Sequence, residues 1–332
     1  MAGRALAFSD PELVKLVTNS FVPVTGDDWY QRRRNDDEGA FFRAVAGQGP
    51  RKGQGGSTRQ GIYCLTASGK LLAYKNASDP EVMREAIRLG LARWKALPAS
   101  ERKPGAFEVP KARKVDANYT RTPPPGGLIL ESHTRILDRD GKGGFSRGTC
   151  KRVGGEQAAR DHVWITREEW QKLIPSDPRK GQTFAMPAAL ADRFLRFHFF
   201  DNTRGEPDHW ERAEVRKSSL TWTVAESDEK EILLRLDGKA LLSTDADPAK
   251  AVRGFDLAVT GHLRYDVEKK AITRFDLLVV GDHWGDQGNA LESRPGRQPL
   301  GLAFRLVAGK DAADRIPPQA ARELPRYFGR ER

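Results

Sequence analysis

The sequence predicts an α+β protein, in which a mixed N-terminal domain precedes a second domain made mainly of antiparallel β-structure. In the first hundred residues, segments with helical spacing of apolar residues alternate with short apolar strands. From residue 128 onward the apolar runs are short and closely spaced, with few helices between them, which favours a β-sandwich or an open barrel. The 332 residues suffice for two domains, each with its own core.

The clearest strand signal is a β-hairpin between residues 254 and 285. Apolar and polar side chains alternate over residues 255–265, and after a polar turn a run rich in β-branched residues covers 272–280. A turn that pairs Val267 with Ala271 fixes the register of the two strands. The predicted cross-strand pairs are Val259 with Val279, Leu263 with Phe275, and His262 with Asp276.

The N-terminal domain is expected to cover residues 1–97. Asp10 and Asp79 are predicted helix N-caps, because each precedes a proline at the first helical position. Residues 47–61 are rich in glycine and predict a loop. In chain order, we expect a helix at 11–19, a strand at 21–24, a helix at 38–46, a hairpin of strands at 62–66 and 71–74, and a helix that begins at residue 80.

This order of elements resembles the thioredoxin-like fold over residues 5–97. The resemblance rests on a helix that leads into Phe21-Val22-Pro23-Val24 and on the hairpin from Ile62-Tyr63-Cys64-Leu65-Thr66 to Leu71-Leu72 before a last helix. Thioredoxin-like enzymes use a Cys-x-x-Cys pair at a helix N-terminus, and this chain has none. The family's proline before the hairpin strand would align near Gln60-Gly61, and neither residue is proline. We therefore expect no disulfide exchange by this domain unless in-frame sequence upstream of Met1 supplies the pair.

A linker and a charged tail are expected on either side of the β-rich domain, which we place at residues 128–309. Residues 98–127 are rich in proline, glycine and basic residues and end in a triple proline, which favours an extended linker. Residues 310–332 form the expected tail. Within the domain we expect strands at 128–137, 220–225, 232–236, 240–243 and 300–307, short helices at 166–173 and 187–197, and a hairpin turn at Asp237-Gly238.

The composition excludes several classes of protein. The net charge of +11 raises the question of nucleic acid, but the basic residues are interleaved with 45 acidic ones, which argues against a phosphate-binding face. No apolar run is long enough to span a membrane. The N-terminus lacks a secretory signal, so we expect a cytoplasmic protein, or an exported one if the true start lies upstream. Cys64 and Cys150 have neither metal-binding nor redox spacing.

Histidines and carboxylates gather in the β-rich domain. Zinc or another divalent metal ion accepts imidazole and carboxylate ligands, so a divalent metal ion is the cofactor that these residues would suit. No His-x-His or His-x-x-x-His pair fixes such a site. The candidate ligands are His198, Asp201, His209, Asp282 and His283, and further candidate site residues are His262, Asp276 and Cys150. The purely structural alternatives are a cross-strand hydrogen bond between His262 and Asp276, a loop-fixing salt bridge between Asp201 and Arg204, and a buried apolar role for Cys64.

Three functions remain open at this stage. The first is a non-catalytic protein, in which a thioredoxin-like module without redox cysteines is joined to a β-rich domain that binds a small molecule or a protein partner. The second is a metal-dependent or His/Asp-based enzyme, although no Gly-x-Ser-x-Gly, P-loop or dinucleotide motif occurs. The third is a thiol-redox protein whose Cys-x-x-Cys lies upstream. The sequence favours the first.

Overall fold

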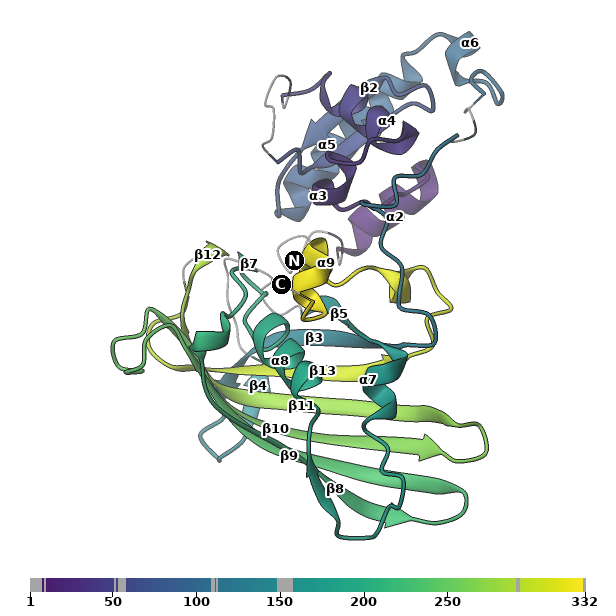
Figure 1. Ribbon diagram of the computed structural model, residues 1–332. Coiled ribbons are helices and arrows are strands. Elements are labelled where there is room, and N and C mark those ends of the chain that lie inside the picture. The colour runs from purple at the N-terminus through teal and green to yellow at the C-terminus, as the bar shows by residue number, and fades with distance from the viewer. Residues whose placement is uncertain are drawn as a thin grey trace. The chain divides into compact units, whose positions relative to one another are not determined.

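The computed structural model describes residues 8, 10–50, 52, 58–108, 111, 113–147, 158–290 and 293–330. The chain divides into two compact units, and the division falls between Arg121 and Thr122 (Figure 1). Each unit has a hydrophobic core of its own, and each is described by itself. The fold is α+β, because helices are combined with a large sheet whose strands pair antiparallel.

The N-terminal unit contains short helices and one two-stranded hairpin. Its elements are α2 (Pro11–Ser20), α3 (Asp28–Gln31), α4 (Asp37–Ala46), β1 (Ile62–Leu65), β2 (Leu71–Lys75), α5 (Pro80–Lys95) and α6 (Ala99–Arg102). Both predicted N-caps are confirmed. The Asp10 carboxylate accepts the Leu13 backbone N–H at 2.7 Å, and the Asp79 carboxylate accepts that of Val82 at 3.0 Å.

The predicted strand at residues 21–24 is wrong. These residues are not in a strand, and Val22 and Val24 are 90% and 87% exposed. Pro23 has no backbone N–H to donate, which weakens any sheet pairing at this position. The core of the unit instead lies between the hairpin and the helices α2 and α5.

Residues after α6 belong in part to the N-terminal unit. The Asp36 carboxylate accepts hydrogen bonds from the Asp116 backbone N–H at 2.8 Å and from the Arg34 side chain, while the Asp116 carboxylate accepts the Asn35 N–H at 2.8 Å. The predicted linker, residues 98–127, therefore includes a segment that is hydrogen-bonded to the α3–α4 region.

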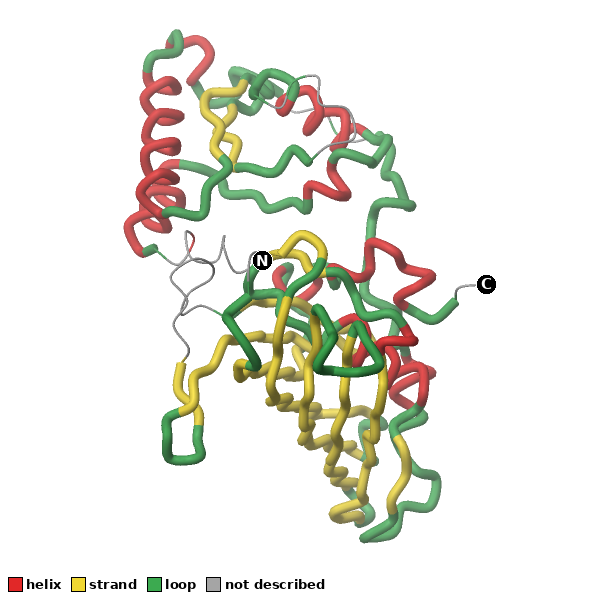
Figure 2. Tube along the Cα trace, turned by 90° about the vertical axis from the view of Figure 1, so that its left-hand side faces the viewer, coloured by secondary structure: helices red, strands yellow, loops and turns green. Residues whose placement is uncertain are grey.

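The β-rich unit is built on one nine-stranded sheet, seen from the side in Figure 2. Its strands follow the order β4-β3-β13-β11-β10-β9-β8-β6, and β5 also pairs with β3. They are β3 (Leu128–Arg139), β4 (Phe145–Arg147), β5 (Ala159–Ile165), β6 (Thr183–Ala185), β8 (Val215–Ser227), β9 (Glu231–Ser243), β10 (Arg253–Asp266), β11 (Ala271–Gly285) and β13 (Gln298–Val307). A separate small sheet joins β7 (Gly205–Pro207) to β12 (Gly288–Ala290).

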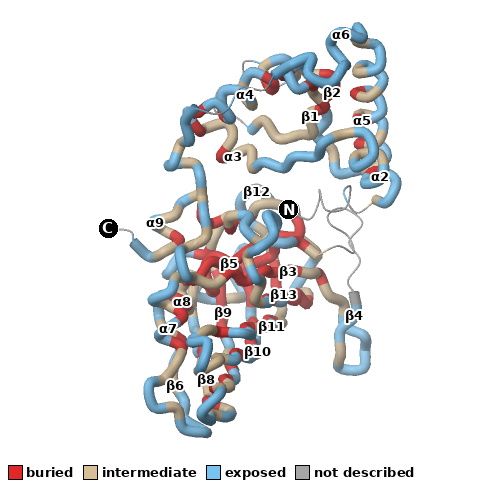
Figure 3. Tube along the Cα trace, turned by 90° about the vertical axis from the view of Figure 1, so that its right-hand side faces the viewer, coloured by how far each residue is buried: buried red, intermediate tan, exposed pale blue. Residues whose placement is uncertain are grey.

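Helices cover one face of this sheet, so the unit is not a sandwich of two sheets. They are α7 (Arg167–Gln171), which starts with the predicted Thr166–Glu169 capping box, and α8 (Ala188–Phe197) (Figure 1). Short turns η1 (Arg212–Glu214), η2 (Ala313–Arg315) and η3 (Gln319–Glu323) and the helix α9 (Leu324–Tyr327) complete the unit. Figure 3 shows buried positions concentrated where the strands meet these helices.

The predicted hairpin register is confirmed in β10 and β11. Val259 lies opposite Val279, Leu263 opposite Phe275, and His262 opposite Asp276. A bulge after Arg264 shifts the last pairs by one residue, so that Asp266 rather than Val267 lies opposite Ala271. Burial alternates along β10, so the sheet has an apolar inner face and an exposed outer face.

The predicted turn at Asp237-Gly238 is wrong, because both residues lie inside the continuous strand β9. Gly238 is opposite Leu220 of β8 and Val259 of β10. A Cβ atom at Gly238 would lie 2.5 Å from a Leu220 methyl and 2.6 Å from the Ser219 carbonyl oxygen. The glycine is therefore needed because the neighbouring strands pack closely at this position. The Asp-Gly dipeptide is also typical of a hairpin turn, so the two cases look alike in the sequence.

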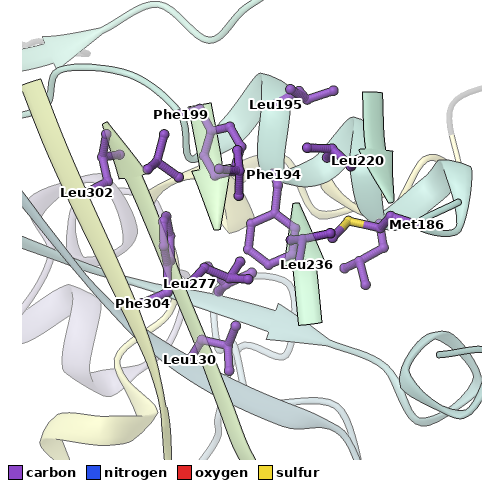
Figure 4. Packing of buried hydrophobic residues seen from close by; sticks show 14 of the residues in the cluster. Leu130, Met186, Phe194, Leu195, Phe199, Leu220, Leu236, Leu277, Leu302 and Phe304 are labelled. Carbon is purple, nitrogen blue, oxygen red and sulfur yellow. The ribbon is translucent and has the colours of Figure 1, made fainter. Parts of the chain in front are cut away.

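The core of the β-rich unit lies between α8 and the inner face of the sheet. Phe194 of α8 projects toward Leu236 of β9 and Leu277 of β11 (Figure 4), and all three side chains are buried. Phe304 of β13 meets the Phe194 ring edge-on, with 5.7 Å between the ring centroids. Burial of one such aromatic side chain contributes about 2–3 kcal/mol. This packing fixes where α8 ends, and therefore where the polar segment after it begins.

Candidate functional site

The structure brings together two of the candidate residues predicted from the sequence, Asp201 and His283. Asp201 lies in the segment that follows α8, and His283 lies near the end of β11. Both are buried and line one small recess at this end of the sheet. The other candidates lie apart from this recess, for the reasons given below.

The segment after α8 is a buried polar loop. The Asp201 carboxylate accepts hydrogen bonds from the Thr203 backbone N–H at 2.9 Å, the Thr203 hydroxyl at 2.6 Å and Arg204 Nε at 2.7 Å. Arg204 also donates to the Gly285 carbonyl of β11 at 3.1 Å, which ties the loop to the sheet. Burial by itself would raise the pKa of Asp201, but His283, Arg204 and Thr203 lower it, so the carboxyl is ionised at neutral pH.

His283 faces inward because it is in phase with the apolar side of the hairpin. It lies opposite Phe255 of β10, and the two rings meet edge-on at 5.8 Å. Burial lowers the pKa of His283 to about 4, although the Asp201 charge acts in the opposite direction. The imidazole is therefore neutral at pH 7.

Asp282 points to the outer face, because successive residues of a strand face opposite sides. It lies opposite Asp256, and its carboxylate accepts a hydrogen bond from Arg139 at 2.5 Å. The pair Asp282-His283 is therefore split by the sheet and cannot ligate one metal ion.

The recess has a volume of about 20 Å³ for a water-sized occupant, which is room for about one water molecule. Arg294 forms part of its wall and is fixed by the Asp138 carboxylate at 2.7 Å and by the Leu137 and Pro299 carbonyls at 3.0 Å. The other lining residues are Ile136, Asp201, Arg204, His283, Ser293, Gln298, Pro299 and Leu300. Ionic and neutral polar side chains thus converge at one end of an otherwise apolar inner face.

His198 belongs to a second buried cluster, which holds the C-terminal segment. Its Nε2 lies 3.0 Å from the Tyr327 hydroxyl, which also accepts the Trp164 backbone N–H at 3.0 Å. His198 Nδ1 is 4.0 Å from the Asp161 carboxylate. Burial raises the pKa of Tyr327 well above its ordinary value, so this Asp–His–Tyr arrangement does not activate the hydroxyl. The residues predicted as a charged tail are therefore anchored in the unit through Tyr327 of α9.

The His209 ring packs against two aromatic rings. Its centroid is 5.1 Å from that of Phe197 and 5.7 Å from that of Phe200. Burial, followed by the charges of nearby arginines, lowers its pKa to about 4. Next to it, Trp210 is fully buried and donates its Nε1–H to the Phe199 carbonyl at 2.9 Å. The predicted metal ligands thus occupy four separate surroundings, and the described residues contain no group of three His, Cys, Asp or Glu suited to a metal ion.

Two further candidates lie on the outer face, and one cannot be placed. His262 and Asp276 are opposite each other on neighbouring strands, where Asp276 also accepts Arg274 Nε at 2.5 Å. His262 is exposed. The register of the predicted pair is therefore confirmed, but among the described residues the Asp276 carboxylate is bonded to Arg274 and not to His262. Cys150 lies outside the described residues.

Sequence reasoning missed Arg253, a fully buried cation at the start of β10. The sequence contained the evidence for it. Alternate residues of β10 face the core, and Arg253 lies two residues before Phe255 in the series that continues with Leu257 and Val259. An arginine at an inward position next to a predicted candidate site is a functional hint. The salt bridge expected between Arg204 and Asp201 is present, with 2.7 Å between Arg204 Nε and the Asp201 carboxylate. The further bond from Arg204 to the Gly285 carbonyl of β11 was not predicted.

A larger depression of about 560 Å³ lies beyond the end of α7, between Lys172 and Phe184. It is open to solvent, and its Arg179–Asp177 ion pair is mostly exposed. Water already satisfies such groups, so this depression offers little to a ligand. The smaller recess at His283 is the better candidate because its polar groups are buried.

Comparisons with protein-family models, with curated proteins and with solved structures find no match to this chain. Among the described residues, no helix is both long and apolar enough to cross a membrane. The functional interpretation therefore rests on the chain's own geometry.

Proposed function

We propose that this protein is a non-catalytic binding protein whose β-rich unit binds a polar group of a small molecule at the recess of Asp201 and His283. The observation that carries the proposal is the convergence of buried polar side chains at one end of an apolar inner face. Ligand sites typically combine an apolar wall with a few fixed polar groups. Here the apolar wall is supplied by Ile136 and Leu300 and the fixed groups by Asp201, Arg204 and His283.

The same residues fit binding better than catalysis. A general acid or base works best with a pKa near the operating pH. The pKa of Asp201 is lowered, and that of His283 is lowered to about 4, so neither exchanges protons readily at pH 7. Both Asp201 oxygens already accept hydrogen bonds from Thr203 and Arg204. Their fixed geometry supports recognition of a ligand.

For the N-terminal unit we propose a thioredoxin-like module without a redox role. The support is the order of a helix, the β1–β2 hairpin and the closing helix α5, without the strand that was expected at residues 21–24. Cys64 is buried in the core, and burial raises the pKa of its thiol to about 11, which suppresses the reactive thiolate. A Cβ at Gly90 of α5 would lie 2.9 Å from the Cys64 sulfur, so the thiol is a packing group. The predicted apolar role of Cys64 fits this environment.

The test is a ligand screen on the full chain. A library of small polar molecules is screened by thermal shift, and hits are titrated by calorimetry into wild type, His283→Gln and the control His262→Gln. His262 has the same side chain on the exposed outer face of the neighbouring strand. We expect His283→Gln to weaken binding about tenfold, the usual worth of a lost hydrogen bond, and His262→Gln to leave it unchanged.

Two results would contradict this proposal. The first is a library that contains no binder. The second is a set of binders whose affinity is the same for wild type and His283→Gln, which would mean that the binding site is not at this end of the sheet. Metal analysis of purified protein addresses the enzyme alternative. A stoichiometric divalent metal that is lost in His283→Gln would favour a metal-dependent enzyme.

A further inference from the structure

Arg253 is held rigidly in the interior of the β-rich unit. Its side chain is 1% exposed, and it lies opposite Gly285 at the end of the sheet where His283 is found. The guanidinium carbon lies over the Trp210 ring, 3.8 Å from the ring centroid. Its Nη1 donates to the Asp208 carbonyl at 2.6 Å. These two contacts hold the group in place.

The opposite edge of the Arg253 guanidinium has no partner within the described part of the chain. Both Nε and Nη2 are buried and without a hydrogen-bond acceptor there, and no described carboxylate lies within 4.0 Å of the group. The other buried arginines of this unit differ, since Arg193 pairs with Glu169 and Arg204 with Asp201. An uncompensated buried cation is costly in a folded protein.

The two unpartnered donors form one fork. Nε–H and one Nη2–H of an arginine point in parallel directions, and this edge matches the two oxygens of a carboxylate or a phosphate. Because Trp210 and Asp208 already hold the group, a ligand would lose little entropy in ordering it. The edge therefore suits an oxyanion better than a neutral polar group.

Two neutral histidines lie near this cation. His209 follows Asp208 in the chain, and its buried Nε2 also lacks a partner among the described residues. His283 stands on the neighbouring strand and lines the recess. The Arg253 charge helps to keep the pKa of both imidazoles low, after burial as the main cause. A neutral imidazole can still donate one hydrogen bond.

We propose that Arg253 binds the oxyanion head group of a small ligand, a carboxylate or a phosphate, through its Nε and Nη2 donors, with His209 and His283 beside it. The inference rests on the proposed function and gives that ligand its chemical class. His283 lines the recess and Arg253 does not, so the head group bound by Arg253 lies beside His283 and next to the recess, which itself has room for about one water molecule.

The test follows the Arg253 side chain directly in the wild-type chain of 332 residues. The Nε–Hε resonance of Arg253 is recorded by nuclear magnetic resonance while sodium acetate, sodium phosphate or sodium chloride is added at matched ionic strength. Arg253→Lys identifies the resonance by its loss, and Arg274→Gln, which removes an exposed arginine of β11, is the matched control. We expect a saturable shift with acetate or with phosphate and none with chloride.

The two anions distinguish the sources of the head group. A shift with acetate alone indicates a carboxylate ligand, and a shift with phosphate alone indicates a phosphorylated one. Arg253→Lys, which keeps the charge but loses the fork, should weaken binding by about tenfold or more. An unchanged resonance with both anions would overturn the inference and leave buried water as the partner of Arg253.

The two proposals fail in distinguishable ways. Neutral library hits that depend on His283, combined with an unperturbed Arg253 resonance, would keep the binding site and reject the oxyanion. Anion binding of undiminished affinity in Arg253→Lys, measured by calorimetry, would also reject this assignment, whatever the library shows.

Discussion

Replacing Asp161 by asparagine should change how the stability of the β-rich unit depends on pH. Asp161 lies on β5, and its carboxylate accepts the Gln319 backbone N–H at 3.1 Å and faces His198 at 4.0 Å. The side chain is 12% exposed, and burial raises the pKa of this carboxyl from 3.8 to about 6, against the lowering effects of the His162 and Gln319 N–H groups. Asparagine keeps an oxygen acceptor for Gln319 and carries no charge at any pH.

The magnitude follows from the difference in pKa between the folded and unfolded states. The folded pKa of Asp161 is raised by about two units, and each unit corresponds to about 1.4 kcal/mol. A raised pKa gives a contribution that is fully present below about pH 4 and is lost as the pH rises through about 6. Relative to Asp161→Asn, wild type should therefore lose about 3 kcal/mol of unfolding free energy between pH 4 and pH 8.

The assay is urea unfolding of the full chain at several pH values, followed by the near-ultraviolet circular dichroism of the buried tryptophans of the β-rich unit. Only the difference between variant and wild type is used, because every other titrating group then cancels. A difference that does not change with pH would refute the reasoning. So would a variant that is less stable at pH 8, since that would mean that Asp161 forms a stabilising ion pair with a protonated His198.

Three further predictions concern single contacts in the same unit. Tyr327→Phe should lower the unfolding free energy by about 1–3 kcal/mol, because the buried Trp164 N–H loses its acceptor while the ring packing is kept. Gly238→Ala should cost about 1–3 kcal/mol, because its Cβ would lie 2.6 Å from the Ser219 carbonyl oxygen. Glu131→Gln should lower the unfolding free energy by about 1–2 kcal/mol at pH 7. This value is kept small because the partner arginines are largely exposed, where water weakens ion pairs. All three are measured by urea denaturation.

The Glu131 effect has a defined pH dependence. Burial alone would raise its pKa, but hydrogen bonds from Arg305, His133 and Arg160 lower it from 4.5 to about 2. A lowered pKa gives stability that is present above pH 4.5 and lost as the pH falls through about 2, so the variant and wild type should converge in acid. Convergence at neutral pH instead would contradict the prediction. Leu278→Ala, at an exposed position of β11, is the control for all three variants and should change stability by less than about 0.5 kcal/mol.

Local sequence patterns predicted secondary structure and strand register correctly where these depend on residues that are close together in the chain. The β10–β11 register followed from the alternation of apolar residues and a short turn, because a slip by one residue would turn Leu263 and Phe275 to solvent. The same locality explains the error at Gly238. A glycine after an aspartate is common in turns, and the sequence does not show that Leu220 occupies the space above it.

The candidate site was predicted in part. The sequence pattern includes Asp201 and His283, but it also groups Asp282 and His198 with them, because nearness in sequence does not establish nearness in space. The pleat of β11 separates Asp282 from His283, and α8 directs His198 toward Tyr327. Arg253 could have been included, because it lies two residues before Phe255 and therefore faces the same side of β10.

The sequence by itself determined the α+β class, the capped helices and the two faces of the long strands, because caps and periodicity depend on neighbours a few residues apart. Only the tertiary structure decided which polar groups meet. The packing of Phe194 against the sheet sets where α8 ends and so places Asp201 beside His283, while the Trp210 ring fixes the buried Arg253. Such meetings depend on how distant segments pack, and no short stretch of sequence contains that information.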